Sequence, residues 1–192
     1  MKTYYLLGIG GIGMSAIARY LKKTGNEVYG YDRISSHLTE ELEKEGINII
    51  YDTTIEEYQK QEKENNSLNL PSHIDLAIYT PAVPEDCVVM QAIKAMDIPL
   101  MKRAAFLGEV TKNKKVIAVS GTHGKTTISG MIAEILKESS VGCSAFLGGI
   151  SNNLHTNFIY NGESEYVVAE ADEYDRSFLQ LRPFISVVTA ID

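Results

Sequence analysis

Apolar residues in the first hundred positions fall in short runs, separated by longer stretches in which they recur every three or four residues. The runs predict buried strands and the stretches predict helices, an alternation typical of a parallel βαβ sheet. Gly25 is placed to end the first helix in a left-handed cap, and Ser36 is placed to cap a second helix that ends near Gly46. The expected strands are residues 4–7, 27–31, 47–51 and 74–79, and the expected helices are residues 15–23 and 36–44.

A polar segment then interrupts this pattern. Residues 56–69 are rich in Glu, Lys, Gln and Asn, which predicts a helix with a solvated face that runs into a surface loop. Beyond it, residues 86–96 and 104–110 are expected to be helical and residues 98–101 extended, before a polar turn at 111–114. We do not expect functional residues in the polar segment.

A domain boundary near Arg103 divides the chain into residues 1–103 and 104–192, because the alternation of strands and helices restarts there. The chain ends on a strand, and a parallel sheet needs a crossover helix after such a strand to cover its face. The second domain is therefore expected to be incomplete in this chain. Its expected strands are residues 116–120, 144–147, 166–170 and 185–191, and its expected helix is residues 126–138.

The first glycine-rich loop runs from Gly8 to Gly13 and fits the pattern G-x-G-x-x-G. It comes directly after a predicted strand and directly before a predicted helix. Glycines there permit a tight turn and let backbone amides approach a diphosphate at the positive end of the helix. Asp32, at the end of the second strand, could accept hydrogen bonds from ribose hydroxyls. The loop indicates a diphosphate more specifically than a nicotinamide, and NAD is one of several ligands with a diphosphate. An NAD site stays open, and so does a structural turn that binds no ligand.

The second glycine-rich loop, from Ser120 to Thr127, carries the sequence Gly-Lys-Thr-Thr between an apolar strand and a helix. This resembles a phosphate-binding loop, in which Lys125 would meet the β and γ phosphates and Thr126 would give a hydroxyl to magnesium. The spacing differs from G-x-x-x-x-G-K-[ST], since Val119 stands at the first glycine. A capped helix after a turn is the alternative, but a lysine at a helix amino terminus is unfavourable without an anion nearby.

A carboxylate is also expected beside such a loop. Glu170 ends an apolar strand and begins an acidic cluster, so we choose it as the second magnesium ligand. Carboxylate and hydroxyl oxygens suit magnesium, which takes few protein ligands and keeps several waters. The alternative is a solvated acidic loop.

Composition and charge restrict the function further. Hydrophobic content of 44% and charged content of 22% are those of an ordinary globular protein. A net charge of −7 without a basic stripe argues against nucleic acid as a partner. No run reaches the ~18 apolar residues that a membrane span needs. Cys87 and Cys143 lack zinc-type spacing, so we expect buried, reduced thiols in a cytoplasmic protein.

Three motifs in this order resemble the Mur ligase family, and the resemblance extends along essentially the whole chain. They are residues 8–15, residues 121–127 and residues 169–173. The shortened phosphate loop is the form that this family uses. The resemblance implies an α/β fold: a Rossmann-like parallel-sheet domain that binds a UDP-sugar, followed by the first part of a P-loop-type α/β ATPase domain. A carboxy-terminal domain that closes over the amino acid is expected to be absent here.

The resemblance also implies roles for individual residues. Lys125 and Glu170 would be catalytic, and Thr126 and Glu170 would hold Mg²⁺. Asn152, Asn153 and His155 are weaker candidates for contacts with the muramoyl group. The implied ATP-binding residues are Gly121, Thr122, His123, Gly124, Lys125, Thr126 and Thr127. The implied UDP-sugar-binding residues are Gly8, Gly10, Gly11, Gly13, Met14, Ser15, Asp32 and Thr80, with Pro81 in the same turn.

The implied reaction is an ATP-dependent ligation in peptidoglycan precursor synthesis. A carboxylate of UDP-N-acetylmuramate attacks ATP to give an acyl phosphate, and the amine of L-alanine displaces the phosphate. This chain alone is not expected to complete the reaction. Two other hypotheses stay open: an NAD-dependent oxidoreductase, which leaves the second loop unexplained, and a non-catalytic nucleotide-binding module. An apolar surface covered at the last strand would favour the module.

Overall fold

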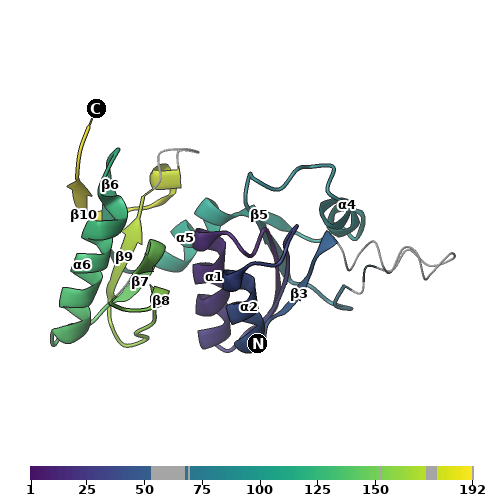
Figure 1. Ribbon diagram of the computed structural model, residues 1–192, viewed down its shortest axis with the longest axis horizontal. Helices are drawn as coiled ribbons and strands as arrows, with labels where there is room; N and C mark the ends of the chain where they lie inside the picture. Colours follow the sequence, from purple (N-terminus) through teal and green to yellow (C-terminus); the bar gives the residue numbers. More distant parts are fainter. Residues whose placement is uncertain (53–67, 69, 152, 172–176, 192) are drawn as a thin grey trace, which may run out of the picture. The chain divides into compact units, whose positions relative to one another are not determined.

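The computed structural model describes residues 1–52, 68, 70–151, 153–171 and 177–191. It divides into two compact units, Met1–Lys102 (unit 1) and Arg103–Asp192 (unit 2) (Figure 1). The helix expected at residues 56–69 falls in a stretch of which Leu68 alone is described, so that prediction lies outside the described residues.

Unit 1 is a parallel five-stranded sheet in the order β3-β2-β1-β4-β5. The order reverses beside β1, which pairs with β2 on one side and β4 on the other. In sheets of this kind, ligands bind at that switch point, outside the carboxyl ends of the strands. The strands are β1 (Thr3–Leu7), β2 (Glu27–Tyr31), β3 (Asn48–Ile50), β4 (Leu76–Tyr79) and β5 (Leu100–Lys102), and the described helices are α1 (Ile12–Lys23), α2 (His37–Lys44) and α4 (Val88–Ala95).

Local signals set the carboxyl ends of α1 and α2 and the start of α2, as the sequence predicts, whereas α1 begins at Ile12 and not at the expected Ser15. Gly25 has φ 80° and Gly46 has φ 82°, and in each case the next residue donates back to the last turn of the helix. Ser36 accepts a hydrogen bond from the Thr39 amide, and the Thr39 hydroxyl accepts one from the Ser36 amide. These caps satisfy backbone groups that the helix itself leaves without partners.

The core of unit 1 forms where strand residues of one face meet α4. Tyr5, Leu7 and Ala77 pack with Val89 and Ile93 of α4, all fully or almost fully buried. Alternation along a strand places Leu6, also buried, on the opposite face. There α1 packs with β1, β2 and α2. Both faces of the sheet are therefore covered, which explains why the central strands β1 and β4 are almost continuously apolar.

Unit 2 is a second five-stranded sheet, in the order β10-β6-β9-β7-β8. Four strands are parallel, and β8 is an antiparallel edge strand against β7 that the sequence analysis did not predict. Helix α6 packs on β7, β9 and β6 (Figure 1). The strands are β6 (Lys115–Ser120), β7 (Ser144–Ser151), β8 (Thr156–Ile159), β9 (Tyr166–Glu170) and β10 (Pro183–Val188), and the helices are α5 (Arg103–Thr111), α6 (Lys125–Glu138) and the 3-10 helix η1 (Ser177–Gln180).

The edge strand β10 ends earlier than the predicted residue 191 and is largely exposed. Phe184, Ile185 and Val188 are 61%, 44% and 54% exposed, and Met131 and Ile135 on α6 are also exposed. A non-catalytic module would be favoured if the apolar residues of this strand were covered, but most of them are exposed. Within the part of the chain described, no helix combines the length and the apolar character that crossing a membrane requires.

Candidate functional site

The first glycine-rich loop lies at the switch point of unit 1. Gly8 has φ +81°, and the amides of Gly8 and Ile9 both donate to the carbonyl of Tyr31, at 2.8 and 3.1 Å. A Cβ on Gly8 would lie 2.6 Å from Cγ2 of Thr80, so Thr80, which follows β4, lies directly against the loop. The fold thus brings together Gly8 and Thr80, two residues far apart in the sequence.

Asp32 closes over the same loop. Its Oδ2 accepts a hydrogen bond from the Gly10 amide at 2.7 Å, and its Oδ1 accepts one from the Arg33 amide at 2.8 Å. A Cβ on Gly10 would lie 2.9 Å from Asp32 Oδ2, so glycine is needed for this approach. The carboxylate that the sequence assigns to a ribose therefore also fixes the shape of the loop.

Two of the predicted UDP-sugar residues, Met14 and Ser15, lie inside the first turn of α1. The two residues are 1% and 0% exposed, and both amides donate to the carbonyl of Gly11. The Ser15 hydroxyl donates to the carbonyl of Ile12 at 2.8 Å. The surface at this end of unit 1 is formed instead by Gly10, Gly11 and Gly13, which are at least partly exposed.

The second loop connects β6 to α6 in unit 2. Gly121 and Gly124 have φ of +126° and +80°, which favours glycine at both positions. Lys125 donates from Nζ to the carbonyl of Gly121 at 2.6 Å. The ammonium is thus held back over the loop. Thr122, His123, Gly124, Thr126 and Thr127, the other predicted ATP-binding residues, are exposed beside it.

Two residues missed by the sequence analysis support this loop. The Thr122 amide donates to the carbonyl of Ala190 at 3.0 Å, and the Thr189 hydroxyl donates to the carbonyls of Ser120 and His123. Both follow β10, the parallel neighbour of β6. Parallel strands end at one edge of a sheet, so residues that follow β10 are expected beside the loop that follows β6. The sequence analysis did not place them there because the expected strand 185–191 included both residues.

Thr126 and Glu170 meet at the carboxyl ends of β6 and β9. The Thr126 hydroxyl lies 3.2 and 3.0 Å from the two Glu170 carboxylate oxygens, and the Gly148 amide donates to Oε2 at 3.0 Å. A hydroxyl and a carboxylate are hard oxygen ligands, and magnesium that is shared with phosphates needs few protein groups. This donor set therefore fits Mg²⁺. Among the described residues, no cluster of three His, Cys, Asp or Glu side chains could hold a metal ion.

Of the weaker muramoyl candidates, the structure describes Asn153 and His155, and their hydrogen bonds lie away from the phosphate loop of unit 2. Asn153 donates to a Glu134 carboxylate oxygen on α6 at 3.0 Å. His155 is exposed with φ 50°, and its amide donates to the carbonyl of Ser151. Asn152 lies outside the described residues.

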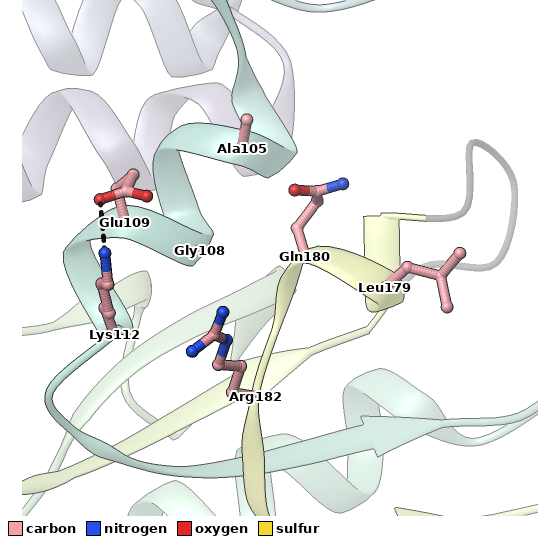
Figure 2. Close-up of a pocket in the computed structure, with 7 residues that line it drawn as sticks. All are labelled: Ala105, Gly108, Glu109, Lys112, Leu179, Gln180 and Arg182. Carbon is pink, nitrogen blue, oxygen red and sulfur yellow. Dashed lines mark ion pairs between the residues drawn. The ribbon is translucent and has the colours of Figure 1, made fainter.

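A separate polar hollow lies between α5 and η1 in unit 2 (Figure 2). Glu109 and Lys112 form an ion pair of 3.9 Å on its α5 side, and Gln180 and Arg182 come from the opposite side. Its volume of about 170 Å³ is below the roughly 300–1,000 Å³ of typical ligand pockets. It also shares no residue with the phosphate loop.

Fold and site together define an α/β protein with one parallel and one mostly parallel sheet, and in each unit the first strand leads into a helix through a glycine-rich loop. Residues 3–115 match the family model described as Mur ligase family, catalytic domain, and residues 119–192 match the Mur ligase middle domain. The chain belongs to the Mur ligase family. The predicted fold class and family resemblance are confirmed.

Similar proteins carry one recurring name. A UDP-N-acetylmuramate–L-alanine ligase from Porphyromonas gingivalis is 45% identical over 192 residues, which cover 100% of this chain and 41% of that protein. The ligase of that name from Cytophaga hutchinsonii is 47% identical, covering 99% of this chain and 40% of the relative. This chain thus spans about 40% of the length of the curated relatives it matches.

Solved structures agree with this family assignment. The UDP-N-acetylmuramate-alanine ligase MurC from Thermotoga maritima has a TM-score of 0.85 at 32% identity, covering 100% of this chain and 42% of that one. The UDP-N-acetylmuramate:L-alanyl-gamma-D-glutamyl-meso-diaminopimelate ligase from Neisseria meningitides has a TM-score of 0.83 at 26% identity, covering 100% and 61%.

Proposed function

We propose that this chain is the UDP-sugar-binding and ATP-binding part of an ATP-dependent ligase that joins L-alanine to UDP-N-acetylmuramate in peptidoglycan precursor synthesis. The observation that carries the proposal is the convergence of Lys125, Thr126 and Glu170 at the carboxyl ends of β6 and β9. These are the cation, hydroxyl and carboxylate that a magnesium triphosphate requires. Residues 1–103 would bind the UDP-sugar and residues 104–192 would bind ATP.

The names of the similar proteins support the choice of sugar nucleotide. The P. gingivalis ligase and the Neisseria ligase differ in the amine partner that their names give, but both names include UDP-N-acetylmuramate. We therefore assign this shared substrate to unit 1, at Gly8–Gly13, Asp32 and Thr80. L-alanine is assigned because the P. gingivalis and C. hutchinsonii ligases of that name are 45% and 47% identical, against 26% for the Neisseria protein.

The reaction brings two anions together, which determines what the site must supply. The carboxylate of UDP-N-acetylmuramate attacks the γ-phosphorus of ATP, ADP leaves, and the L-alanine amine then displaces phosphate from the acyl phosphate. Lys125 would neutralise charge on the transferred phosphoryl group, and the loop amides would hold the phosphates. Mg²⁺, held by Thr126 and Glu170, would further screen the triphosphate.

An oxidoreductase is the weaker proposal. It would use the Gly8–Gly13 loop and Asp32 but would leave Lys125 and the Thr126–Glu170 pair without a role. Membership in the Mur ligase family also favours the ligase.

Replacing Lys125 tests the proposal. Lys125→Met keeps the apolar stem but removes the charge, so Mg²⁺-ATP should bind at least about tenfold more weakly, as expected for the loss of one charge-assisted hydrogen bond. Isothermal titration calorimetry on the 192-residue chain measures this directly.

Lys137→Met is the matched control, because Lys137 lies in the last turn of the same helix and pairs with Glu138. It should bind Mg²⁺-ATP as the unmodified chain does. No binding of Mg²⁺-ATP by the unmodified chain, or equal binding by Lys125→Met, would overturn the ATP assignment.

A further inference from the structure

Strand β7 contains two adjacent glycines, Gly148 and Gly149, at the level of the Thr126–Glu170 pair. We infer that these glycines are positioning residues that hold the carboxylate and the hydroxyl in place for Mg²⁺. The inference rests on the proposed ATP site and adds residues to it that do not contact substrate. Glycine inside a strand often marks a close approach of another group, which is the case here.

Gly148 determines where the Glu170 carboxylate lies. Strand β7 pairs with β9 as far as Phe146 and Ala169, and two residues later the Gly148 amide donates to Glu170 Oε2 at 3.0 Å. A Cβ on Gly148 would lie 2.2 to 2.6 Å from three atoms of that carboxylate. No side chain larger than hydrogen fits there unless the carboxylate moves.

Gly149 leaves room for the Thr126 side chain, as Gly148 does for the Glu170 carboxylate. A Cβ on Gly149 would lie 2.8 Å from Cγ2 of Thr126, on the first turn of α6. The two branches of a threonine are fixed to one carbon, so displacing Cγ2 also turns the hydroxyl away. The glycine pair therefore leaves room for both members of the proposed metal pair.

A side chain in this space should weaken metal binding more than it lowers the stability of the fold. The Glu170 carboxylate is the end of a flexible side chain, so an added methyl group can push it aside without moving the sheet. Groups that orient metal ligands typically change metal affinity by roughly 10–100-fold when they are altered. A residue that merely stabilises the fold would instead weaken nucleotide binding with and without metal alike.

The experiment measures ATP affinity of the 192-residue chain by calorimetry, once with Mg²⁺ and once with EDTA. The quantity of interest is the ratio of the two affinities, which reports the contribution of the metal. Gly148→Ala should lower this ratio about tenfold while the affinity in EDTA stays unchanged, and Gly149→Ala should lower it in the same direction. Gly130→Ala is the matched control, because a Cβ there meets nothing within 4 Å.

Gly130→Ala should leave both affinities unchanged, and circular dichroism should show all three variants folded. An unchanged ratio in Gly148→Ala, with binding intact in the parent chain, would overturn the inference and leave the ATP site standing. Equal losses with Mg²⁺ and with EDTA would also overturn it, since they indicate a structural role. If the parent chain shows no Mg²⁺-dependent gain at all, the proposed function itself fails.

Discussion

Cys143 lies just before β7 and is 1% exposed, with its Sγ 3.5 Å from the carbonyl of Ala133. Burial raises the pKa of this thiol to about 11, from an ordinary value of 9.0. Between these two values the folded chain keeps a proton that the unfolded chain releases. The thiol therefore makes the free energy of unfolding fall as pH rises from about 9 to about 11, and has little influence below that range.

Cys143→Ala should flatten this pH dependence. The free energy of unfolding of the unmodified chain should fall by about 1–2 kcal/mol more than that of the variant between pH 9 and 11. Urea unfolding at several pH values gives both curves. Buried tyrosines such as Tyr5, whose pKa is also raised by burial, titrate in both proteins and cancel in the difference. Parallel curves would show that the thiol is not protected in the folded state.

At the scale of single elements, the sequence predicts best what depends on neighbours along the chain. The carboxyl ends of α1 and α2 follow from Gly25 and Gly46, and the start of α2 follows from Ser36, because caps are made within one helical turn. Strand β8 was missed because Thr156–Ile159 is short and half polar, and it exists through its pairing with β7. Contacts such as that of Thr189 with the phosphate loop span more than sixty positions and leave no local pattern.

The side-chain cap at the start of α2 can be tested by substitution of Ser36. Ser36→Ala removes the acceptor for the Thr39 amide, so α2 should lose about 1 kcal/mol of local stability. Ser36→Asn should stay close to the unmodified chain, because asparagine caps equally well. Hydrogen exchange of the α2 amides, led by Thr39, measures the effect. Equal protection in the two variants would mean that packing of Leu38 and Leu42 determines the stability of α2.

For the whole molecule, charge and topology explain how an acidic chain could bind anions. The net charge is −7, and both proposed ligands carry phosphates. The attraction must therefore be local, from loop amides and Lys125, and not from the overall field of the protein. Sequence motifs identified both loops because the glycines of each loop, and Lys125 in the second loop, lie close together in the sequence. They could not reveal that Asp32 binds Gly10, or that Gly148 binds Glu170, because side-chain contacts between strands depend on the folded sheet.

Every strand pairing described lies within one unit, β1 to β5 in the first and β6 to β10 in the second. A ligand stabilises the cooperative unit that binds it, by an amount that grows with its concentration relative to Kd. UDP-N-acetylmuramate should therefore slow hydrogen exchange in residues 8–15, and Mg²⁺-ATP should slow it in residues 120–128. Mass spectrometry of the full chain reads both regions in one experiment. If Mg²⁺-ATP protected residues 8–15 instead, the assignment of nucleotides to units would have to be exchanged.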